Sequence, residues 1–150
     1  MKTRVQAGSV FSFNLSAGWA APLAPTQEVP VTKRFFLGGF YNSLRGYDPA
    51  KIGPRGGNRN EAIGGDFMDL ANVDFRLRVW NGLGLLVFAD AGNVYADVKA
   101  ARWGDLRFST GLGLYYVTPV GPVGASYAFA LARSGGAAFG QFYVTIGNAF

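Results

Sequence analysis

Arg45 is the residue whose surroundings most suggest a charged binding site. It lies in the stretch FFLGGFYNSLRGYDPAKIGPR, residues 35–55, between glycines and aromatic residues. A guanidinium can bind carboxylates in a forked geometry that lysine cannot match, so Arg45 could hold a loop against acidic side chains. The spacing alone leaves a second interpretation open, in which Arg45 is a solvated loop residue and the glycines only form turns.

The composition leaves little for catalysis. The 150 residues include no cysteine and no histidine, which removes thiol nucleophiles, imidazole bases and the usual zinc ligands. GLGLYY and GGAAFG resemble phosphate-binding loops, but neither is followed by Lys-Ser/Thr or by a helix. The net charge of +5 could suggest nucleic acid, but the basic residues are spread through loops and one strand face. We therefore expect no enzyme, no metal, no cofactor and no nucleic-acid partner.

Alternation of apolar and polar residues predicts about six long β-strands. We expect them at residues 5–19, 66–80, 83–95, 106–116, 123–131 and 142–150, so that the last strand reaches the final residue. Asn81-Gly82 marks a tight hairpin. The segment TPVGP, residues 118–122, is also expected to be a turn, because neither proline can donate a hydrogen bond to a ladder.

The two faces of these strands differ in polarity. On the second strand, one face carries Ala71, Val73, Phe75, Leu77 and Val79, and the other carries Asn72, Asp74, Arg76 and Arg78. Hydrophobic residues make up 49% of the chain, yet no run approaches the roughly 18 apolar residues of a membrane-spanning helix. A soluble β-sandwich shares part of this signature. The pattern favours an all-β fold, an antiparallel up-and-down transmembrane β-barrel, with residues 1–150 forming one barrel segment.

The connections alternate between short and long. The short turns share one end, which is periplasmic in outer-membrane barrels, and the long loops share the other, extracellular end. Asp74 and Asp90 fall on the polar faces of adjacent strands. If the hairpin closes through Asn81-Gly82-Leu83, they lie directly opposite each other and repel, unless a cation lies between them.

Five stretches, in order, resemble the C-terminal barrel region of the BamA/TamA outer-membrane protein-assembly superfamily, also called the bacterial surface antigen superfamily. FFLGGFYNSLRGY resembles the lid loop of that family, with Gly38-Gly39 and the Arg45-Gly46-Tyr47 signature. The other four stretches are GGD at Gly64, VFADAGNVY, TPVGPVGASYAF and FYVTIGNAF. The resemblance covers nearly the whole chain, and we call its residues 21–62 the lid loop.

The resemblance implies a sixteen-stranded barrel behind periplasmic POTRA domains, with the lid loop folded into the lumen. There Arg45 is expected to meet two acidic residues of the wall, Asp74 and Asp90. This chain departs from the pattern, because it has about six strands and no POTRA segment. Its first residues, MKTRVQAG, also lack the apolar core of a secretory signal, so we expect a mature fragment. Self-association or further strands would then be needed to close the barrel.

The function that the resemblance implies is non-enzymatic. The chain is expected to be the barrel portion of an outer-membrane protein assembly or insertion factor, integral to the bacterial outer membrane, with outer-membrane lipids and nascent barrel proteins as partners. One alternative is a translocation pore of the two-partner secretion type, in which the same lid plugs a channel. Another is an inactive structural fragment or engineered barrel. The sequence leaves the substrate and the mode of closure open.

Two features of the strand ends complete these expectations. Gly147 is a candidate weak point of the closing seam, from which the ladder frays toward Phe150, and Gly147→Val is expected to stiffen it. Alternatively, Gly147 only makes room for a neighbour in the lumen. The aromatic ring of Phe150 would anchor the strand at the membrane interface. Tryptophans near predicted strand ends fit an interfacial aromatic girdle: Trp19, Trp80 and Trp103.

Overall fold

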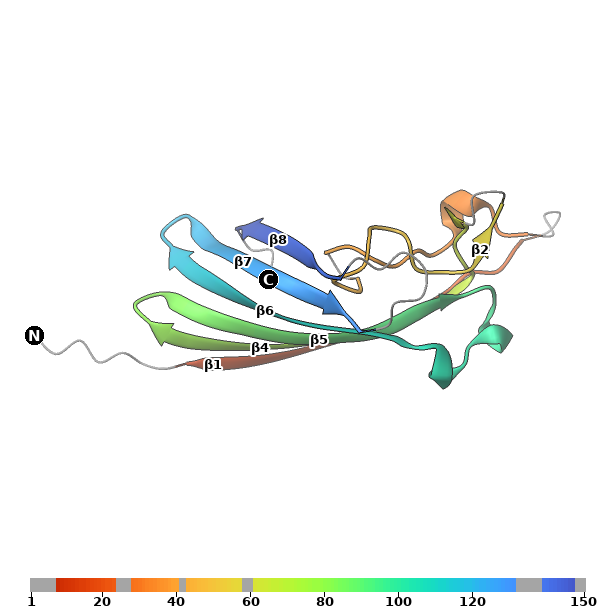
Figure 1. Ribbon diagram of the computed structural model, residues 1–150. Helices are drawn as coiled ribbons and strands as arrows, with labels where there is room; N and C mark the ends of the chain where they lie inside the picture. The colour runs from red at the N-terminus through yellow and green to blue at the C-terminus, as the bar shows by residue number, and fades with distance from the viewer. Residues whose placement is uncertain (1–7, 24–27, 41–42, 58–60, 132–138, 148–150) are drawn as a thin grey trace, which may run out of the picture.

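A computed structural model of the chain describes residues 8–23, 28–40, 43–57, 61–131 and 139–147. Its main element is a six-stranded sheet in the order β1-β4-β5-β6-β7-β8 (Figure 1). Every neighbouring pair is antiparallel, so the predicted all-β, up-and-down arrangement is confirmed. The strands are β1 Ser9–Trp19, β4 Phe67–Trp80, β5 Leu83–Tyr95, β6 Arg107–Thr118, β7 Gly121–Ala130 and β8 Gln141–Ile146.

Short elements lie in the two long connections. Between β1 and β4, the chain forms the 3₁₀ helix η1 (Val31–Lys33) and a two-stranded sheet of β2 (Arg55–Gly56) and β3 (Glu61–Ala62). Between β5 and β6 it forms two more 3₁₀ helices, η2 (Val98–Ala100) and η3 (Trp103–Asp105). None of the helices in the described part of the chain has the length and hydrophobicity of a transmembrane helix.

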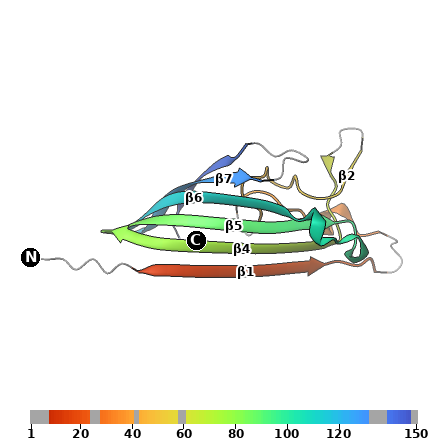
Figure 2. The same cartoon turned by 60° about the horizontal axis from the view of Figure 1, so that its bottom comes forward.

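The sheet curls, and the lid loop lies against its concave side at the end away from the short turns (Figures 1 and 2). The convex face carries exposed apolar side chains, among them Phe75, Val87, Leu112 and Phe129. The residues that alternate with these along each strand lie on the concave face, where several are buried, including Leu70, Phe88, Asp90 and Ser109. The predicted alternation between an outward and an inward face therefore follows the pleat of each strand, but the inward face carries apolar side chains such as Leu70 and Phe88 beside its polar ones.

The predicted hairpin turn at Asn81-Gly82 is confirmed, whereas the β6–β7 turn is tighter than the sequence suggested. Asn81 and Gly82 both have positive φ, 40° and 87°, as the central residues of a type I′ turn require. The β6–β7 turn contains only Pro119 and Val120, because Gly121 already pairs with Thr118. The expectation that Pro122 belongs to the turn was wrong: Pro122 lies in β7 and pairs with Val117 of β6. Its carbonyl accepts a hydrogen bond from the amide of Gly147.

The ends of the first and last strands also differ from the prediction. β1 begins at Ser9, and the predicted start at residues 5–7 lies outside the described residues. β8 ends at Ile146, one residue before a bend at Gly147, so the prediction of a strand continuing through Gly147 was wrong. Residues 148–150, including Phe150, lie outside the described residues. Within the described part, β1 and β8 are the two edges of an open sheet.

The orientation of the two faces can be tested with single-cysteine variants, since the chain has no cysteine of its own. Spin labels at Val87→Cys and Leu112→Cys are expected to be relaxed by oxygen dissolved in lipid, because these positions face outward. Labels at Ser12→Cys and Arg78→Cys are expected to be relaxed by a water-soluble nickel complex. Equal relaxation of the two sets would contradict a membrane-facing convex side.

Candidate functional site

The lid loop has a small apolar core of its own, which it shares with the sheet. Leu44, Tyr47 and Ile52 are buried, together with Leu37, against Leu70 of β4 and Val94 of β5. Two backbone hydrogen bonds between Leu37 and Ile52 draw the two arms of the loop together. Because these apolar contacts fix both arms, the turn between them is held in one position above β4 and β5.

The paired glycines help to form that turn. The amide of Gly38 donates to Ser43 Oγ at 2.7 Å, and the carbonyl of Gly38 accepts from the amide of Ala50. The amide of Gly39 donates to the carbonyl of Tyr47 at 3.1 Å. These contacts cross the loop just before and just after Arg45, and they leave the Arg45 side chain pointing at the sheet.

Arg45 contacts both of the aspartates that the sequence singled out. Its Nε donates to Asp90 Oδ2 at 2.8 Å, and its Nη2 donates to Asp90 Oδ1 and, at 2.7 Å, to Asp74 Oδ1. The Asp90 side chain has no exposed surface, whereas that of Asp74 is 19% exposed. Arg45 therefore forms a forked pair with Asp90, and the same Nη2 reaches a second carboxylate.

Asp90 also accepts hydrogen bonds from two neighbouring strands and from the loop backbone. Asn72 Nδ2 of β4 donates to Oδ1 at 2.9 Å, and Ser109 Oγ of β6 donates to Oδ2 at 3.2 Å. The backbone amide of Arg45 donates to the same Oδ2 at 3.2 Å. Asn72 in turn accepts from Asn14 Nδ2 of β1 and donates to the carbonyl of Ser43. A polar row thus crosses β1, β4, β5 and β6, with Asp90 as its most connected member.

The expectation that Asp74 and Asp90 lie directly opposite each other was wrong. Trp80 pairs with Leu83 across the two-residue turn, and the register then shifts by one residue between Arg78 and Trp80. As a result Asp90 pairs with Asn72, and Asp74 pairs with Phe88. The two carboxylates are diagonal neighbours on the inward face, and Arg45 Nη2 lies between them.

The ring of Phe88 completes the surroundings of Arg45. The guanidinium carbon lies 3.7 Å from the ring centroid, which is a cation–π contact. Burial alone lowers the pKa of Arg45, but the hydrogen bond to Asp90 and the charges of Asp90 and Asp74 outweigh this effect and raise the pKa overall. The cation is therefore retained at every physiological pH.

Gly46 and Tyr47 carry the turn across to the later strands. Gly46 has φ +84°, and a Cβ there would approach the backbone of Ala128–Ala130 in β7 to between 3.1 and 3.3 Å, so a larger residue would be strained. The Tyr47 ring is buried in the loop core, and its hydroxyl donates to the carbonyl of Phe108 in β6. The three residues of the signature therefore contact four neighbouring strands: Arg45 contacts β4 and β5, Tyr47 contacts β6, and Gly46 contacts β7.

The sequence interpretation missed the residues that attach the turn to β8. The amide of Gly46 donates to Tyr143 Oη at 2.9 Å, and that hydroxyl donates to Gln141 Oε1 at 2.9 Å. Gln141 Nε2 then donates to Asp48 Oδ1 at 2.6 Å. The Tyr143 ring also packs on Phe40, with centroids 4.9 Å apart. A polar Gln and a Tyr hydroxyl on the inward face of the last strand were the available signal.

Gly147 follows β8 with φ +87°, and no atom lies within 4 Å of the position that a Cβ would occupy. This φ argues against the expectation that Gly147→Val stiffens the seam, because a β-branched residue is strained there even where space is available. Glycine at position 147 therefore allows the positive φ of the bend that follows β8.

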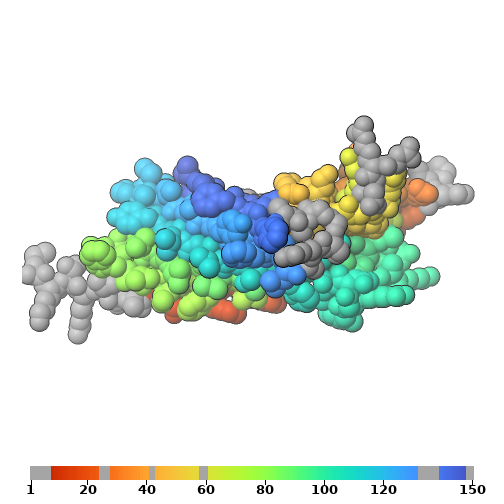
Figure 3. Space-filling model, in the orientation of Figure 1, coloured from red at the N-terminus to blue at the C-terminus, as the bar shows by residue number. Residues whose placement is uncertain are grey.

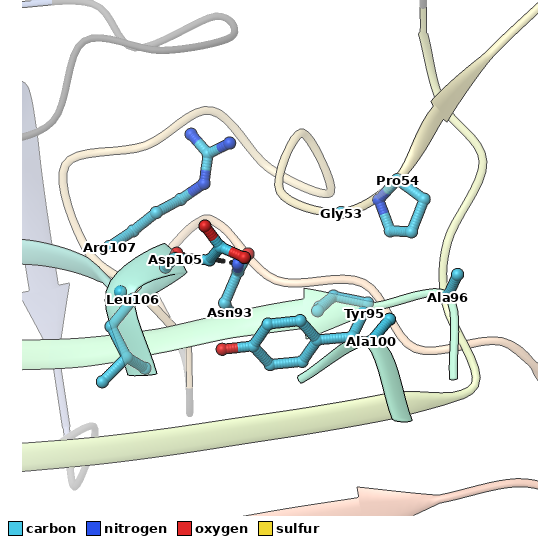
Figure 4. Close-up of a pocket in the computed structure, with 11 residues that line it drawn as sticks. Gly53, Pro54, Asn93, Tyr95, Ala96, Ala100, Asp105, Leu106 and Arg107 are labelled. Carbon is cyan, nitrogen blue, oxygen red and sulfur yellow. Dashed lines mark hydrogen bonds between the residues drawn. The ribbon is translucent and has the colours of Figure 1, made fainter. Parts of the chain in front are cut away.

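A pocket of about 450 Å³ lies beyond the ion pair, at the end of the sheet (Figure 4). Gly53 and Pro54 of the lid loop line one part, and Asn93, Asp105 and Arg107 line another. Within the described residues, no cluster of acidic, cysteine or histidine side chains could hold a metal ion.

The curled sheet, its apolar convex face and the loop held against its polar concave face define an outer-membrane β-barrel protein with an inward-folded loop. The Omp85 superfamily domain matches residues 3–150. The chain belongs to the Omp85 superfamily and corresponds to its C-terminal barrel region, as the resemblance implied. It is accordingly an integral protein of the bacterial outer membrane.

Two curated relatives and one solved structure show how far the similarity extends. The outer membrane protein assembly factor BamA of Nitratidesulfovibrio vulgaris is 34% identical over 131 residues, which cover 82% of this chain and 16% of that protein. BamA of Neorickettsia risticii is 33% identical over 140 residues, which cover 88% and 17%. A crystal structure of BamA from Haemophilus ducreyi lacking POTRA domains 1–3 is 22% identical, with a TM-score of 0.72 and coverage of 91% and 31%. The chain thus spans less than a fifth of these curated relatives.

We expect Arg45→Ala to destabilise the fold by roughly 3 to 5 kcal/mol, because it leaves Asp90 buried without a cation. The loosened lid loop should become open to trypsin at Lys51 and Arg55. Arg45→Lys should restore part of the stability, since an ammonium supplies the charge without the fork. Urea unfolding and limited proteolysis measure both effects. Arg78→Ala, an exposed arginine on the same face of β4, is the control, and an equal loss in this control would contradict a specific role for Arg45.

We expect Gly147→Val to lower the free energy of unfolding by about 1 to 3 kcal/mol, the usual cost of a strained backbone conformation. Gly147→Asn should lose less, because asparagine adopts positive φ more readily. Thermal unfolding of the two variants measures the difference. A Val variant as stable as the wild type would show that the bend at Gly147 does not require positive φ.

Proposed function

We propose that this chain is the barrel portion of an outer-membrane protein assembly and insertion factor, with the lid loop held in the lumen and a weak closing seam at β8. The assembly function is supported by relatives named as assembly factors. The observation that carries the proposal is the double attachment of one turn. Arg45 binds β4 and β5, and its neighbours Gly46 and Asp48 bind β8.

The closing strand is suited to pairing with an incoming strand. β8 has 6 residues, whereas β7 has 10 and β6 has 12, and its ladder to β7 ends at the bend of Gly147. A sheet edge presents unpaired backbone groups that can template another strand. Phe142, Val144 and Ile146 of β8 are exposed on the outward face. They would continue the apolar outward face of an incoming strand that pairs with β8.

In this function, the lid loop would support the seam rather than block a channel. The hydrogen bonds through Tyr143 and Gln141 hold β8 from the inside, so release of the turn would remove these contacts and leave the short ladder to β7, together with the contacts of Thr145 and the Tyr143 ring, to hold the strand. Nascent barrel proteins and outer-membrane lipids would be the partners. Self-association or strands of a longer protein would close the barrel.

A translocation pore of the two-partner secretion type is the second candidate. The polar inward face, with Arg76 and Arg78 on β4, could line a channel that the same loop plugs. The two functions differ in what release of the loop does: it would impair assembly in the first case and increase conductance in the second.

The proposal can be tested with the full protein that carries this chain, reconstituted in vesicles with an unfolded barrel precursor. We expect the protein to accelerate folding of the precursor, measured by its heat-modifiability in gels. Arg45→Ala should abolish most of this acceleration, and Tyr143→Phe should reduce it while the Phe40 contact is kept. Tyr116→Phe, an outward tyrosine of β6, is the matched control and should leave the rate unchanged.

Ion conductance through a planar bilayer provides the opposing measurement. No acceleration by the wild-type protein, together with a conductance that rises in Arg45→Ala, would overturn the assembly function in favour of a pore. Neither acceleration nor conductance would favour a purely structural barrel.

A further inference from the structure

The β5–β6 loop, residues 96–106, covers part of the face of the sheet that should meet lipid. By the alternation of β5, Asn93 and Tyr95 point to the same outward side as Val87. Val87 is exposed, yet Asn93 is only 8% exposed and Tyr95 only 5%. Another part of the chain therefore covers the amide of Asn93 and the phenol of Tyr95, although both lie on an apolar outward face.

That cover is supplied by the loop itself. Asn93 Nδ2 donates to the carbonyl of Asp105 at 2.8 Å, and the Tyr95 hydroxyl donates to the carbonyl of Arg102 at 3.2 Å (Figure 4 shows the first bond). These bonds satisfy two polar side chains with which lipid acyl chains could not form hydrogen bonds. Both ribbon views place η2 and η3 on the convex side of the sheet, opposite the lid loop (Figures 1 and 2). The loop is therefore docked on the outer wall.

The docked loop directs its own side chains outward. Trp103 is 88% exposed, and Val98 is also exposed. Lys99 and Arg102, which lie between Val98 and Trp103 in the sequence, are exposed as well. The loop also contains two acidic residues: the carboxylate of Asp97 accepts from the amide of Ala100 and caps η2, and Asp105 is exposed. In the space-filling view, this segment forms a projection below the lid loop (Figure 3).

A row of aromatic residues marks the level of the membrane interface at this end. Trp19 of β1 pairs with Phe67 of β4, and Phe67 pairs with Tyr95 of β5. The rings of Phe67 and Tyr95 are stacked 6.0 Å apart. Aromatic rows of this kind lie at the boundary between acyl chains and headgroups. The β5–β6 loop starts directly after Tyr95, so it lies at headgroup level.

We propose that the β5–β6 loop is a lipid-binding element, in which Trp103 inserts into the headgroup region on the lid-loop side of the membrane and Lys99 and Arg102 bind lipid phosphates. An indole is stable there because its ring is apolar and its N–H is polar. Long basic side chains extend from the same level to phosphate. Lipid is the occupant because the loop lies on the outward face of a protein integral to the outer membrane.

Fluorescence of a single tryptophan tests the insertion of Trp103. The chain has three tryptophans, so Trp19→Phe/Trp80→Phe, made in a full protein whose tryptophans outside this chain are also replaced by phenylalanine, leaves Trp103 as the reporter in reconstituted vesicles. Heat-modifiability confirms that each variant is folded. We expect strong quenching by phospholipids brominated near the headgroup and weak quenching by acrylamide in the buffer. Trp80→Phe/Trp103→Phe, which leaves Trp19, is the reference for an interfacial residue.

Two outcomes would overturn the insertion. Quenching by acrylamide without quenching by brominated lipid would place Trp103 in water. Quenching by neither would mean that another protein segment or a second copy covers it.

Charge variants test the phosphate contacts separately. In the single-tryptophan background, addition of phosphatidylglycerol to phosphatidylcholine vesicles should shift the emission of Trp103 further to the blue. Lys99→Gln/Arg102→Gln should remove this additional shift, while the backbone carbonyl of Arg102 still accepts from Tyr95. A shift of the same size in the variant would overturn the phosphate contacts.

Discussion

The buried carboxylate of Asp90 is the constraint on which the inner side of this sheet depends. An ionised aspartate without exposed surface is stable only when it is paired and hydrogen-bonded. No cation on β5 itself can reach it, since the inward neighbours along the strand are Phe88 and Gly92. The cation comes from the lid loop, as Arg45, and the remaining donors come from β4 and β6. The loop and the wall therefore require each other.

This requirement acts through the loop's apolar contacts as well as through its charge. Leu44 and Tyr47, on either side of the Arg45-Gly46 pair, are buried against Leu70 and Val94, so the guanidinium does not have to be ordered by the ion pair alone. Gly46 then allows the backbone to pass close to β7 and to reach Tyr143. Adjacent residues of one turn thus contact strands at both sides of the sheet. Any movement that withdraws Arg45 from Asp90 must also strain the bond between Gly46 and Tyr143.

The strands could be predicted because alternation of apolar and polar residues records which face meets lipid, and the third strand was placed at its observed ends. The register between β4 and β5 could not, because an extra residue near Val79 shifts the ladder and leaves no mark in the alternation. The inward Gln141 and Tyr143 of β8 are visible in the sequence, but their contact with the turn depends on how the sheet curls, which no local pattern encodes. The docking of the β5–β6 loop had a local signal: Asn93 and Tyr95 are polar positions on the outward face of β5, whose other residues are apolar.

The polar row also limits what can complete this sheet. It runs from Ser109 through Asp90 and Asn72 to Asn14, whose amide lies on the free edge strand β1. Asn14 Nδ2 donates to Asn72 Oδ1 and to Ser16 Oγ, and the side-chain oxygen Oδ1 of Asn14 can accept a further hydrogen bond from a neighbouring strand or from water. A strand that pairs with β1 therefore sets a donor beside Asn14 or leaves room for water. An apolar residue beside Asn14 would bury the side-chain oxygen of Asn14 without a hydrogen-bond partner. Asn14 is hydrogen-bonded through Asn72 to Asp90, so this loss of stability would also weaken the ion pair of Asp90 with Arg45.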